Sequence, residues 1–326
     1  MTDLVTLGES MALFTARRTG PLRHARDFGL GVGGAESNVA IGVSRLGGRA
    51  AWIGRVGADE FGELLRSTLA GEGVDVRGMR VDPGAPTGLM IKSRRTAEMV
   101  DVRYYRSASA GSRLCPSDLD VSLIRSARVL HVTGITLALS ASAAEAVRAA
   151  IAEARDAGVT VSMDVNYRRA LWTPAEASAA LRETVASVDV LFATEGEARL
   201  VVEGDDPLTL AGALSALGPR HVLVKRGALG AIELSDGAVR HAEPYRVVEL
   251  DPVGAGDAFA AGWIAETLAG AAPERRLATA CAAGAFAVTA DGDWESLPRR
   301  ADLDLLRPSG TADAADATGT VDAVSR

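Results

Sequence analysis

Short apolar runs alternate with longer amphipathic stretches over most of this chain. The apolar runs are rich in Val, Leu and Ile and read as buried strands at 4–9, 50–57, 128–134, 159–166, 188–194 and 220–227. Between them, apolar residues recur at helical spacing, with glycine at several ends, at 36–47, 60–73, 140–158 and 174–187. This alternation predicts an α/β fold with a mostly parallel sheet covered by helices on both faces. Such sheets bind ligands beyond the carboxyl ends of their strands.

Two segments depart from the alternation. Residues 11–32 and 87–107 read as strands and turns without helices, and we expect them to form a small β lid over one edge of the sheet. From 308 to 326 the residues are small, polar and acidic, which predicts a disordered tail. The folded domain is therefore expected to span 1–307.

The composition indicates which binding partners and which cellular compartment to expect. The 326 residues carry a net charge of −7, which argues against a nucleic-acid or membrane partner. No signal peptide or membrane-spanning run is evident, and Cys115 and Cys281 lie far apart, so we expect a cytoplasmic protein. Lys92 and Lys225 are the only lysines, which we attribute to a genomic bias toward arginine.

The stretch DPVGAGDAFAAGW, residues 251–263, carries the clearest chemistry. A helical pattern follows the glycines, so Gly254, Ala255 and Gly256 should form its first turn, where backbone N–H groups lack internal partners and attract anions. Asp257 beside this cradle should be ionised and suits a general base that takes a hydroxyl proton. The combination fits phosphoryl transfer to an alcohol. The alternative is a glycine-rich loop with Asp257 as a capping residue.

That stretch resembles the C-terminal signature of the ribokinase-like (PfkB) carbohydrate kinases, and residues 31–62 resemble their N-terminal signature. The resemblance extends over residues 3–305. It implies a ribokinase-like three-layer α/β/α sandwich with a β lid over a sugar site. It also implies that Asp257 is the catalytic base and that Gly254, Ala255 and Gly256 form the anion hole, with ATP and Mg²⁺ as phosphoryl donor and metal. A sugar-binding protein without catalysis is a more distant alternative.

The N-terminal signature contains the glycines of the sugar site. The resemblance implies that Gly33 and Gly34 let the backbone approach the sugar and that Asn38 hydrogen-bonds its hydroxyls. Residues 29–34 also match GxGxxG, which would indicate dinucleotide binding, but residues 24–30 make a poor central strand. A helix-start glycine turn remains a plain alternative.

The nucleotide site is expected around the strand–turn–strand pattern at 222–231. The resemblance assigns Lys225, Gly227 and Gly230 to ATP, together with Asn166, although the two glycines could simply form a hairpin turn. Glu197 matches a glutamate tied to magnesium and phosphate. Thr194 stands where the family usually has asparagine, and Glu197 could be an ordinary first-turn glutamate. No P-loop motif occurs.

The lid stretch 102–112 bears on the substrate. Strand alternation places Tyr104 and Arg106 on one face, and arginine matches the two-point geometry of a carboxylate, which favours an acidic sugar. This stretch, with 130–140 and 162–172, resembles the 2-keto-3-deoxygluconate kinases within the family. That likeness implies further sugar contacts from Ile135 and Arg168. Asp293, near the C-terminal end, is a further candidate for contact with a sugar hydroxyl. The arginines could instead form surface ion pairs, and Met90 stands where a lid aromatic residue is expected.

Together these patterns predict ATP-dependent phosphorylation of the C6 hydroxyl of 2-dehydro-3-deoxy-D-gluconate. A kinase for fructose, ribose or a related acid is the nearer alternative. The family resemblance also implies a K⁺ site near Asp251. It further implies a homo-oligomer in which lid strands pair between subunits.

Overall fold

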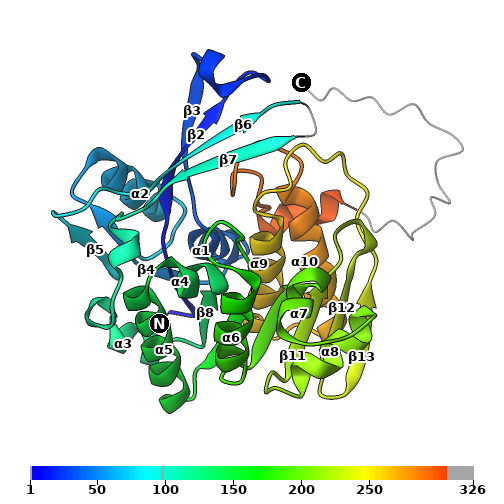
Figure 1. The fold of residues 1–326 in the computed structure, drawn as a ribbon. Coiled ribbons are helices and arrows are strands. Elements are labelled where there is room, and N and C mark those ends of the chain that lie inside the picture. Colours follow the sequence, from blue (N-terminus) through cyan, green and yellow to red (C-terminus); the bar gives the residue numbers. More distant parts are fainter. Residues whose placement is uncertain (1, 97–98, 307–326) are drawn as a thin grey trace, which may run out of the picture.

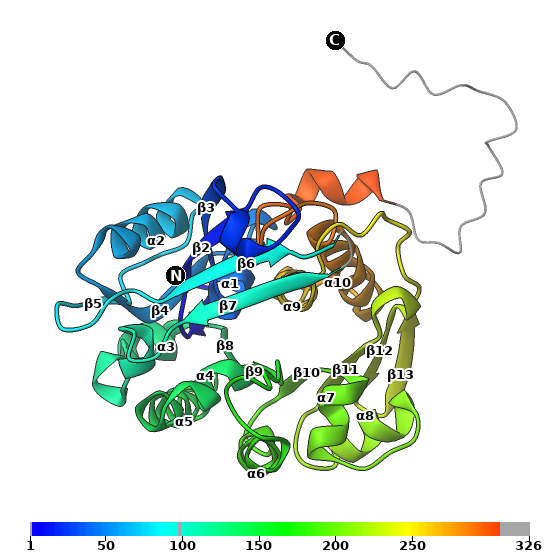
Figure 2. The same cartoon turned by 45° about the horizontal axis from the view of Figure 1, so that its top comes forward.

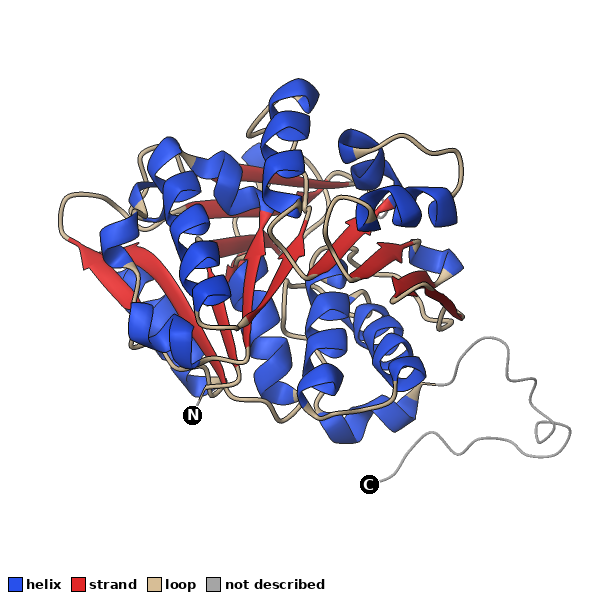
Figure 3. Ribbon diagram, turned by 90° about the horizontal axis from the view of Figure 1, so that it is seen from below, coloured by secondary structure: helices blue, strands red, loops and turns tan. Residues whose placement is uncertain are grey.

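The architecture is a central sheet between two layers of helices, with a second, smaller sheet standing at one edge (Figures 1 and 3). The computed structural model describes residues 2–96 and 99–306. Within them the central sheet has nine strands in the order β13-β12-β11-β10-β9-β8-β1-β4-β5, and it is parallel except at β12 and β13. The strands are β1 Leu4–Leu7, β4 Ala50–Gly57, β5 Met79–Asp82, β8 Val129–Thr133, β9 Thr160–Asp164, β10 Val190–Thr194, β11 His221–Lys225, β12 Ala231–Ser235 and β13 Ala238–Ala242.

Both faces of this sheet are covered, which explains why its strands read as continuous apolar runs. All five residues of β8 are buried, as are all four of β1. One helical layer contains α1 Ala35–Arg45, α2 Glu60–Gly71, α9 Ala255–Leu268 and α10 Pro273–Ala287. The opposite layer contains α3 Val121–Ser126, α4 Gly134–Leu139, α5 Ala141–Asp156, α6 Pro174–Val185, α7 Glu195–Val201 and α8 Pro207–Ser215. Each layer has its own hydrophobic core against the sheet.

Helix α9 is buried on every side. Residues 257–266 are all buried, because α1 and α10 pack on the helix from outside and the sheet lies beneath it. Phe192 of β10 anchors it through edge-on ring contacts with Phe259 at 6.2 Å and Trp263 at 5.8 Å. The helix that begins at the GAGD stretch is therefore held rigidly in the core.

The lid is a separate four-stranded sheet in the order β3-β2-β6-β7 (Figure 2). Its strands are β2 Met11–Ala16, β3 Phe28–Gly33, β6 Leu89–Arg94 and β7 Val100–Tyr105. Strands β2 and β6 run parallel, whereas the outer pairs are antiparallel. Because β1 continues into β2 and β3 leads directly into α1, the lid is connected to the body at the carboxyl edge of the central sheet.

The predicted strands, helices and β lid are therefore present, and the ribokinase-like three-layer arrangement is confirmed. The GxGxxG run falls in lid strand β3 and at the start of α1, so it does not follow the central strand that a dinucleotide site requires. The tail predicted at 308–326 lies outside the described residues. In the part of the chain that the structure describes, no helix is long and apolar enough to span a membrane.

Candidate active site

The central parallel strands end beneath the lid (Figure 1), and candidate residues lie at those strand ends. Asp164 ends β9, Thr194 ends β10 and Lys225 ends β11. The first turn of α9 brings Asp257 to the same edge. Residues from distant parts of the chain thus meet at the crevice where open α/β sheets bind ligands.

Asp257 is held by two amide side chains. Its Oδ2 accepts a hydrogen bond from Asn38 Nδ2 at 2.8 Å, and its Oδ1 accepts one from Asn166 Nδ2 at 3.3 Å. Asn166 adopts φ +41°, a left-handed conformation that asparagine tolerates better than most residues. Asn38 lies on α1, so two separate elements orient the carboxylate.

Burial raises the pKa of Asp257 to about 7. The hydrogen bond from Asn38 and the positive charges of Arg168 and Lys225 lower the pKa, but by less than burial raises it. Asp257, which we expect to be ionised beside the helix mouth, is therefore only partly ionised near neutral pH. The carboxyl is 8% exposed, and the sequence did not show how deeply the fold would bury it. A base whose pKa lies near neutrality is well matched to accepting a proton from an alcohol.

At the helix mouth beside Asp257, the backbone N–H groups of Gly254 and Gly256 have no hydrogen-bond partner among the described residues, and that of Ala255 makes a long contact of 3.5 Å to the Pro252 carbonyl oxygen. Gly254 is the N-cap of α9, with φ +83°, and no side chain caps the helix. A Cβ at Gly254 would collide with the carbonyl oxygen of Asp293, so only glycine fits. Ala255 and Gly256 then begin the helix, and this geometry can receive an anion.

A cavity of about 410 Å³ opens beside this helix mouth. It is lined by Lys225, Gly227 and Gly230 on one side and by Ala255 and Gly256 on the other. Its remaining lining is largely apolar and is made by Thr194, Ala228, Pro244, Tyr245, Val247, Glu249, Pro252, Phe259, Cys281, Gly284, Ala285 and Val288. A slot with an apolar end and an anion-binding end fits a nucleotide.

Lys225 lies between this cavity and Asp164. Its Nζ donates to both carboxylate oxygens of Asp164, at 2.8 and 2.6 Å. Although burial opposes its charge, Asp164 and Glu197 raise the pKa of Lys225, so the ammonium stays protonated. A Cβ at Gly256 would lie 3.2 Å from Lys225 Nζ, which places this cation directly against the helix mouth.

Glu197 forms a capping box with Thr194. Thr194 donates to Glu197 Oε2 through its N–H at 2.7 Å and its hydroxyl at 2.9 Å, and the Tyr167 N–H donates to Oε1 at 2.9 Å. Despite burial, the charge of Lys225 and these hydrogen bonds lower the pKa of Glu197. Glu197 is thus an ionised carboxylate with a structural role. Within residues 2–96 and 99–306, no three His, Cys, Asp or Glu side chains gather as a metal cluster.

The glycines expected at the sugar sit where the body meets the lid. A Cβ at Gly33 would collide with Asp293 Oδ2 and with the methyl group of Met90, so Gly33 lets these side chains approach the backbone. Gly34 is pressed against the backbone of Glu9 and Ser10. Met90 is buried with Met11 and Leu13 in the core of the lid.

Arg106 and Tyr104 contact each other, as expected for residues on one face. The guanidinium carbon of Arg106 lies 5.6 Å from the centre of the Tyr104 ring. However, Arg106 also donates from Nε to Oε2 of the buried Glu9 at 2.7 Å, and its Nη2 lies 2.6 Å from the same oxygen as an ion pair. Ser109 donates to the other oxygen of Glu9. The arginine is therefore fixed in place by a buried carboxylate that sequence reasoning missed.

Ile135 and Arg168 follow the ends of β8 and β9. Ile135 is buried in the first turn of α4, whereas Arg168 is exposed. Arg168 lies close enough to act electrostatically on both Asp257 and Asp164. Its charge thus reaches the candidate base across the opening.

Asp251, expected at a K⁺ site, already has a cation. Lys92 Nζ lies 2.6 Å from Asp251 Oδ2 and 3.1 Å from Asp293 Oδ1. The Asp251 side chain is inaccessible to solvent, and its Oδ1 accepts from the Val253 N–H at 3.2 Å. The arrangement does not fit an additional monovalent ion at this carboxylate.

The site residues missed from the sequence are Glu9, Lys92 and Asp164. The scarcity of lysine is a signal that could have pointed to Lys92 and to the partner of Lys225. These are the only two lysines in the sequence, and both lie at the site and pair with buried aspartates. Scarce lysine in an arginine-rich chain marks positions that need a compact ammonium. Nothing local distinguishes Glu9, because its partner Arg106 is distant in sequence.

Comparison with known proteins decides the class of enzyme. Residues 1–300 match the pfkB family of carbohydrate kinases. The chain belongs to this family. It is 41% identical to a 2-dehydro-3-deoxygluconokinase of Thermoproteus tenax, covering 91% of this chain and 92% of that protein. It is 38% identical to the 2-dehydro-3-deoxygluconokinase of Bacillus subtilis, over 92% of this chain and 94% of that protein. It is 37% identical to a fructokinase of Klebsiella pneumoniae, over 83% of this chain and 90% of that protein.

Solved structures agree with the family assignment. An E. coli protein assigned as a ribokinase II, in complex with ATP and Mg²⁺, superposes with a TM-score of 0.88 at 30% identity, covering 94% of this chain and 98% of that one. A 2-dehydro-3-deoxygluconokinase of Thermotoga maritima superposes with a TM-score of 0.86 at 26% identity (94% and 99%). As a pfkB-family sugar kinase, the chain uses ATP and a divalent metal to phosphorylate a sugar.

Proposed function

We propose that this pfkB-family kinase transfers the γ-phosphoryl group of ATP to the C6 hydroxyl of 2-dehydro-3-deoxy-D-gluconate. The observation that carries the proposal is Asp257, a buried carboxyl with pKa about 7 at an uncapped helix mouth. The two 2-dehydro-3-deoxygluconokinases at 41% and 38% identity support the substrate.

The proposed roles follow from the contacts. Asp257 takes the proton of the C6 hydroxyl while the hydroxyl oxygen bonds to the γ-phosphorus of ATP. The bond between the γ-phosphorus and the oxygen that bridges to the β-phosphate breaks, and ADP leaves. The N–H groups at 254–256 and the Lys225 ammonium stabilise the transferring group. Asn38 and Asn166 orient the base. Asn38 Oδ1 is buried and has no hydrogen-bond partner within residues 2–96 and 99–306, so it can accept a hydrogen bond from a substrate hydroxyl.

Magnesium would be held mainly by the phosphates, whose charge it neutralises. Glu197 fits a water-mediated contact because Thr194 and Tyr167 keep it ionised, and Thr194 itself lines the nucleotide cavity. Gly227 and Gly230 border the same cavity with positive φ angles of 56° and 78°. These two residues let the chain turn closely around the nucleotide.

The acidic sugar would meet Arg106 and Arg168, with Tyr104, Gly33, Gly34, Ile135 and Asp293 completing its site. Arg106 is presented rigidly by Glu9, and Arg168 is exposed at the opening. A planar guanidinium can still offer its remaining N–H donors to a carboxylate.

The neutral-sugar alternative has one observation in its favour. Glu9 already compensates the charge of Arg106, which weakens the attraction for a second carboxylate. The experiment is ADP release with ATP and Mg²⁺ on 2-dehydro-3-deoxygluconate, 2-dehydro-3-deoxygalactonate, fructose, ribose and gluconate. A higher kcat/KM for fructose than for either keto-deoxy acid would overturn the substrate.

Assembly through the lid is a further proposal. Lid strands leave Leu30 at 53% and Tyr105 at 60% exposure, which is apolar surface suited to a second copy of the chain. Light scattering after size exclusion tests it, and a dimer that Leu30→Asp converts to monomer is the expected result. A monomeric wild type would refute the proposal.

A further inference from the structure

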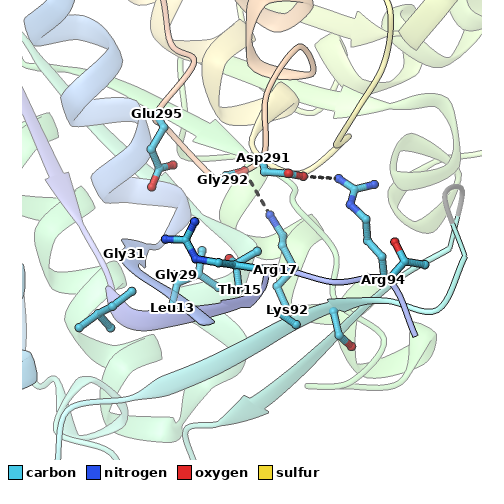
Figure 4. Close-up of a pocket in the computed structure, with 14 residues that line it drawn as sticks. Leu13, Thr15, Arg17, Gly29, Gly31, Lys92, Arg94, Asp291, Gly292 and Glu295 are labelled. Carbon is cyan, nitrogen blue, oxygen red and sulfur yellow. Dashed lines mark hydrogen bonds and ion pairs between the residues drawn. The ribbon is translucent and has the colours of Figure 1, made fainter. Parts of the chain in front are cut away.

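Lys92 is a buried lid residue whose ammonium reaches into the body of the enzyme. Its side chain is 3% exposed, and Nζ contacts Asp251 Oδ2 at 2.6 Å, Asp293 Oδ1 at 3.1 Å and the Gly292 carbonyl oxygen at 3.1 Å. Figure 4 shows it pointing from β6 toward the loop that contains Gly292. Three oxygen contacts around one buried cation resemble an ion site that the chain fills itself.

Both carboxylates that Lys92 binds adjoin the anion hole. Asp251 accepts from the Val253 N–H, directly before Gly254. The Asp293 carbonyl oxygen lies against Gly254 so closely that no Cβ fits between them. The position of the helix-mouth glycine is therefore set from both sides by residues that share the Lys92 ammonium.

We propose that Lys92 is a positioning residue for the anion hole, and that its ammonium takes the place of a monovalent cation at Asp251. This inference rests on the proposed kinase function. It predicts that turnover does not require K⁺, in contrast to the expectation from family resemblance. Because Lys92 belongs to lid strand β6, the same contact also ties the lid to the phosphoryl-transfer site.

The electrostatics require a cation here. Asp251 and Asp293 are two buried carboxylates around one point, and without a positive charge they would repel each other at low dielectric. Although burial opposes it, the two carboxylates raise the pKa of Lys92, so it remains charged. Other charged groups face the position: Arg94 lies 4.0 Å from Asp251 and 2.6 Å from Asp291. The pKa of Asp293 is raised, first by burial and then by the negative charges of Glu295 and Asp251, while Lys92 opposes the rise.

A small ion could reach this position if the lysine were removed. Lys92 and Gly292 line a cavity of about 430 Å³ between the lid and the loop at 291–295 (Figure 4). Truncation of Lys92 to alanine would open the carboxylates to this cavity. A K⁺ or NH₄⁺ ion could then replace the lost ammonium.

The test compares turnover in KCl, NH₄Cl and choline chloride at equal ionic strength, with the best sugar of the panel. The wild type should change less than about 2-fold between salts. Lys92→Ala should lose at least about 10-fold in kcat in choline chloride and recover several-fold in KCl or NH₄Cl. Arg103→Ala is the matched control: it removes an exposed lid cation that pairs with Asp101, and it should behave as wild type.

The melting temperature gives a readout that does not depend on turnover. Lys92→Ala should melt higher in KCl than in choline chloride, whereas the wild type should show no such difference. If Lys92→Ala does not fold, the double variant Lys92→Met with Asp251→Asn removes both charges and should show no K⁺ response in kcat or in melting temperature. Several-fold K⁺ stimulation of the wild type, or a salt-independent Lys92→Ala with wild-type kcat, would overturn the proposal. Failure of every sugar would instead count against the proposed function, and the melting data would still decide the role of Lys92.

Discussion

At the scale of single residues, Asp257 meets two opposed requirements. Its burial excludes water from the phosphoryl-transfer site, and the same burial makes its negative charge costly. Asn38 and Asn166 compensate by donating to its two oxygens. The balance leaves a carboxyl that can exchange a proton near neutral pH.

A pH profile follows from this balance. The base acts only when deprotonated, so kcat/KM should rise with pH up to about 7 and then level off. Asp257→Asn should lower kcat by at least about 100-fold at every pH, because it cannot accept the proton. Initial rates between pH 5.5 and 9 measure both effects. A profile that is flat across pH 7 in the wild type would contradict the assigned pKa.

Asp257 should also make the stability of the fold depend on pH: activity rises with pH, whereas its contribution to stability falls. Between about pH 4 and pH 7 the folded protein holds a proton on Asp257 that the unfolded chain has already released, so this group's stabilisation declines as pH rises through that window. Asp257→Asn removes the dependence. The variant should therefore melt higher than the wild type at pH 8 and show a smaller difference at pH 5. Asn38 can turn its unpartnered Oδ1 toward the new amide, so the hydrogen bond is retained. If the melting temperatures of variant and wild type differed equally at pH 5 and pH 8, Asp257 could not be a buried carboxyl with a raised pKa.

Under the proposed function, we expect Arg106 to distinguish the acid from the neutral sugars. Arg106→Lys keeps the charge but loses the planar donors that serve Glu9 and a substrate carboxylate together. We expect KM for the keto-deoxy acid to rise about 10-fold, equivalent to about 1.4 kcal/mol, with a smaller change for fructose. Arg103→Lys, an exposed lid residue, is the control. Equal effects on acid and neutral sugars would show that Arg106 supports the lid rather than the carboxylate.

At the scale of elements, the start of α9 is the critical point. Gly254→Ala places a Cβ against the Asp293 carbonyl oxygen at φ +83°, so the helix mouth must shift. We expect kcat to fall at least about 100-fold, comparable to the loss of an oxyanion donor. Gly270→Ala is a matched control, since its φ is +71° but nothing lies within 4 Å of the added methyl group. It should cost about 1–2 kcal/mol of stability and leave kcat unchanged. If the two variants had equal activity, the close approach at Gly254 would have no role in catalysis.

The elements themselves were largely predictable from the sequence. Apolar runs such as 128–134 became strands because helices cover both faces of the sheet, and that environment selects continuous apolar residues. Helix α6, expected at 174–187 from its apolar periodicity, begins in the structure with a capping box in which Thr173 and Glu176 pair across Pro174. Local chemistry of this kind acts within a few residues and is legible without the fold.

At the scale of the whole molecule, buried ion pairs connect the lid to the body. Lys92 of the lid pairs with the buried Asp251 of the body. Arg106, which follows the last lid strand, pairs with the buried Glu9 in the segment that links β1 to the lid. A sugar held between these parts should stabilise the folded chain by mass action. At 100 times its dissociation constant, 2-dehydro-3-deoxygluconate should add about 2.7 kcal/mol and raise the melting temperature by several degrees. Gluconate at the same concentration should raise it less. A smaller shift with the keto-deoxy acid than with fructose would point to the neutral-sugar alternative.

The sequence alone determined the strand–helix order, the β lid, and the glycines and aspartate of the helix mouth, because propensity, periodicity and capping are local properties. Only the tertiary structure decided which buried charges meet: Glu9 with Arg106, Asp164 with Lys225, and Lys92 with Asp251 and Asp293. It also set the pKa of Asp257, since desolvation depends on every element packed around the group. Side chains far apart along the chain interact only after the fold has brought them together in a low-dielectric interior.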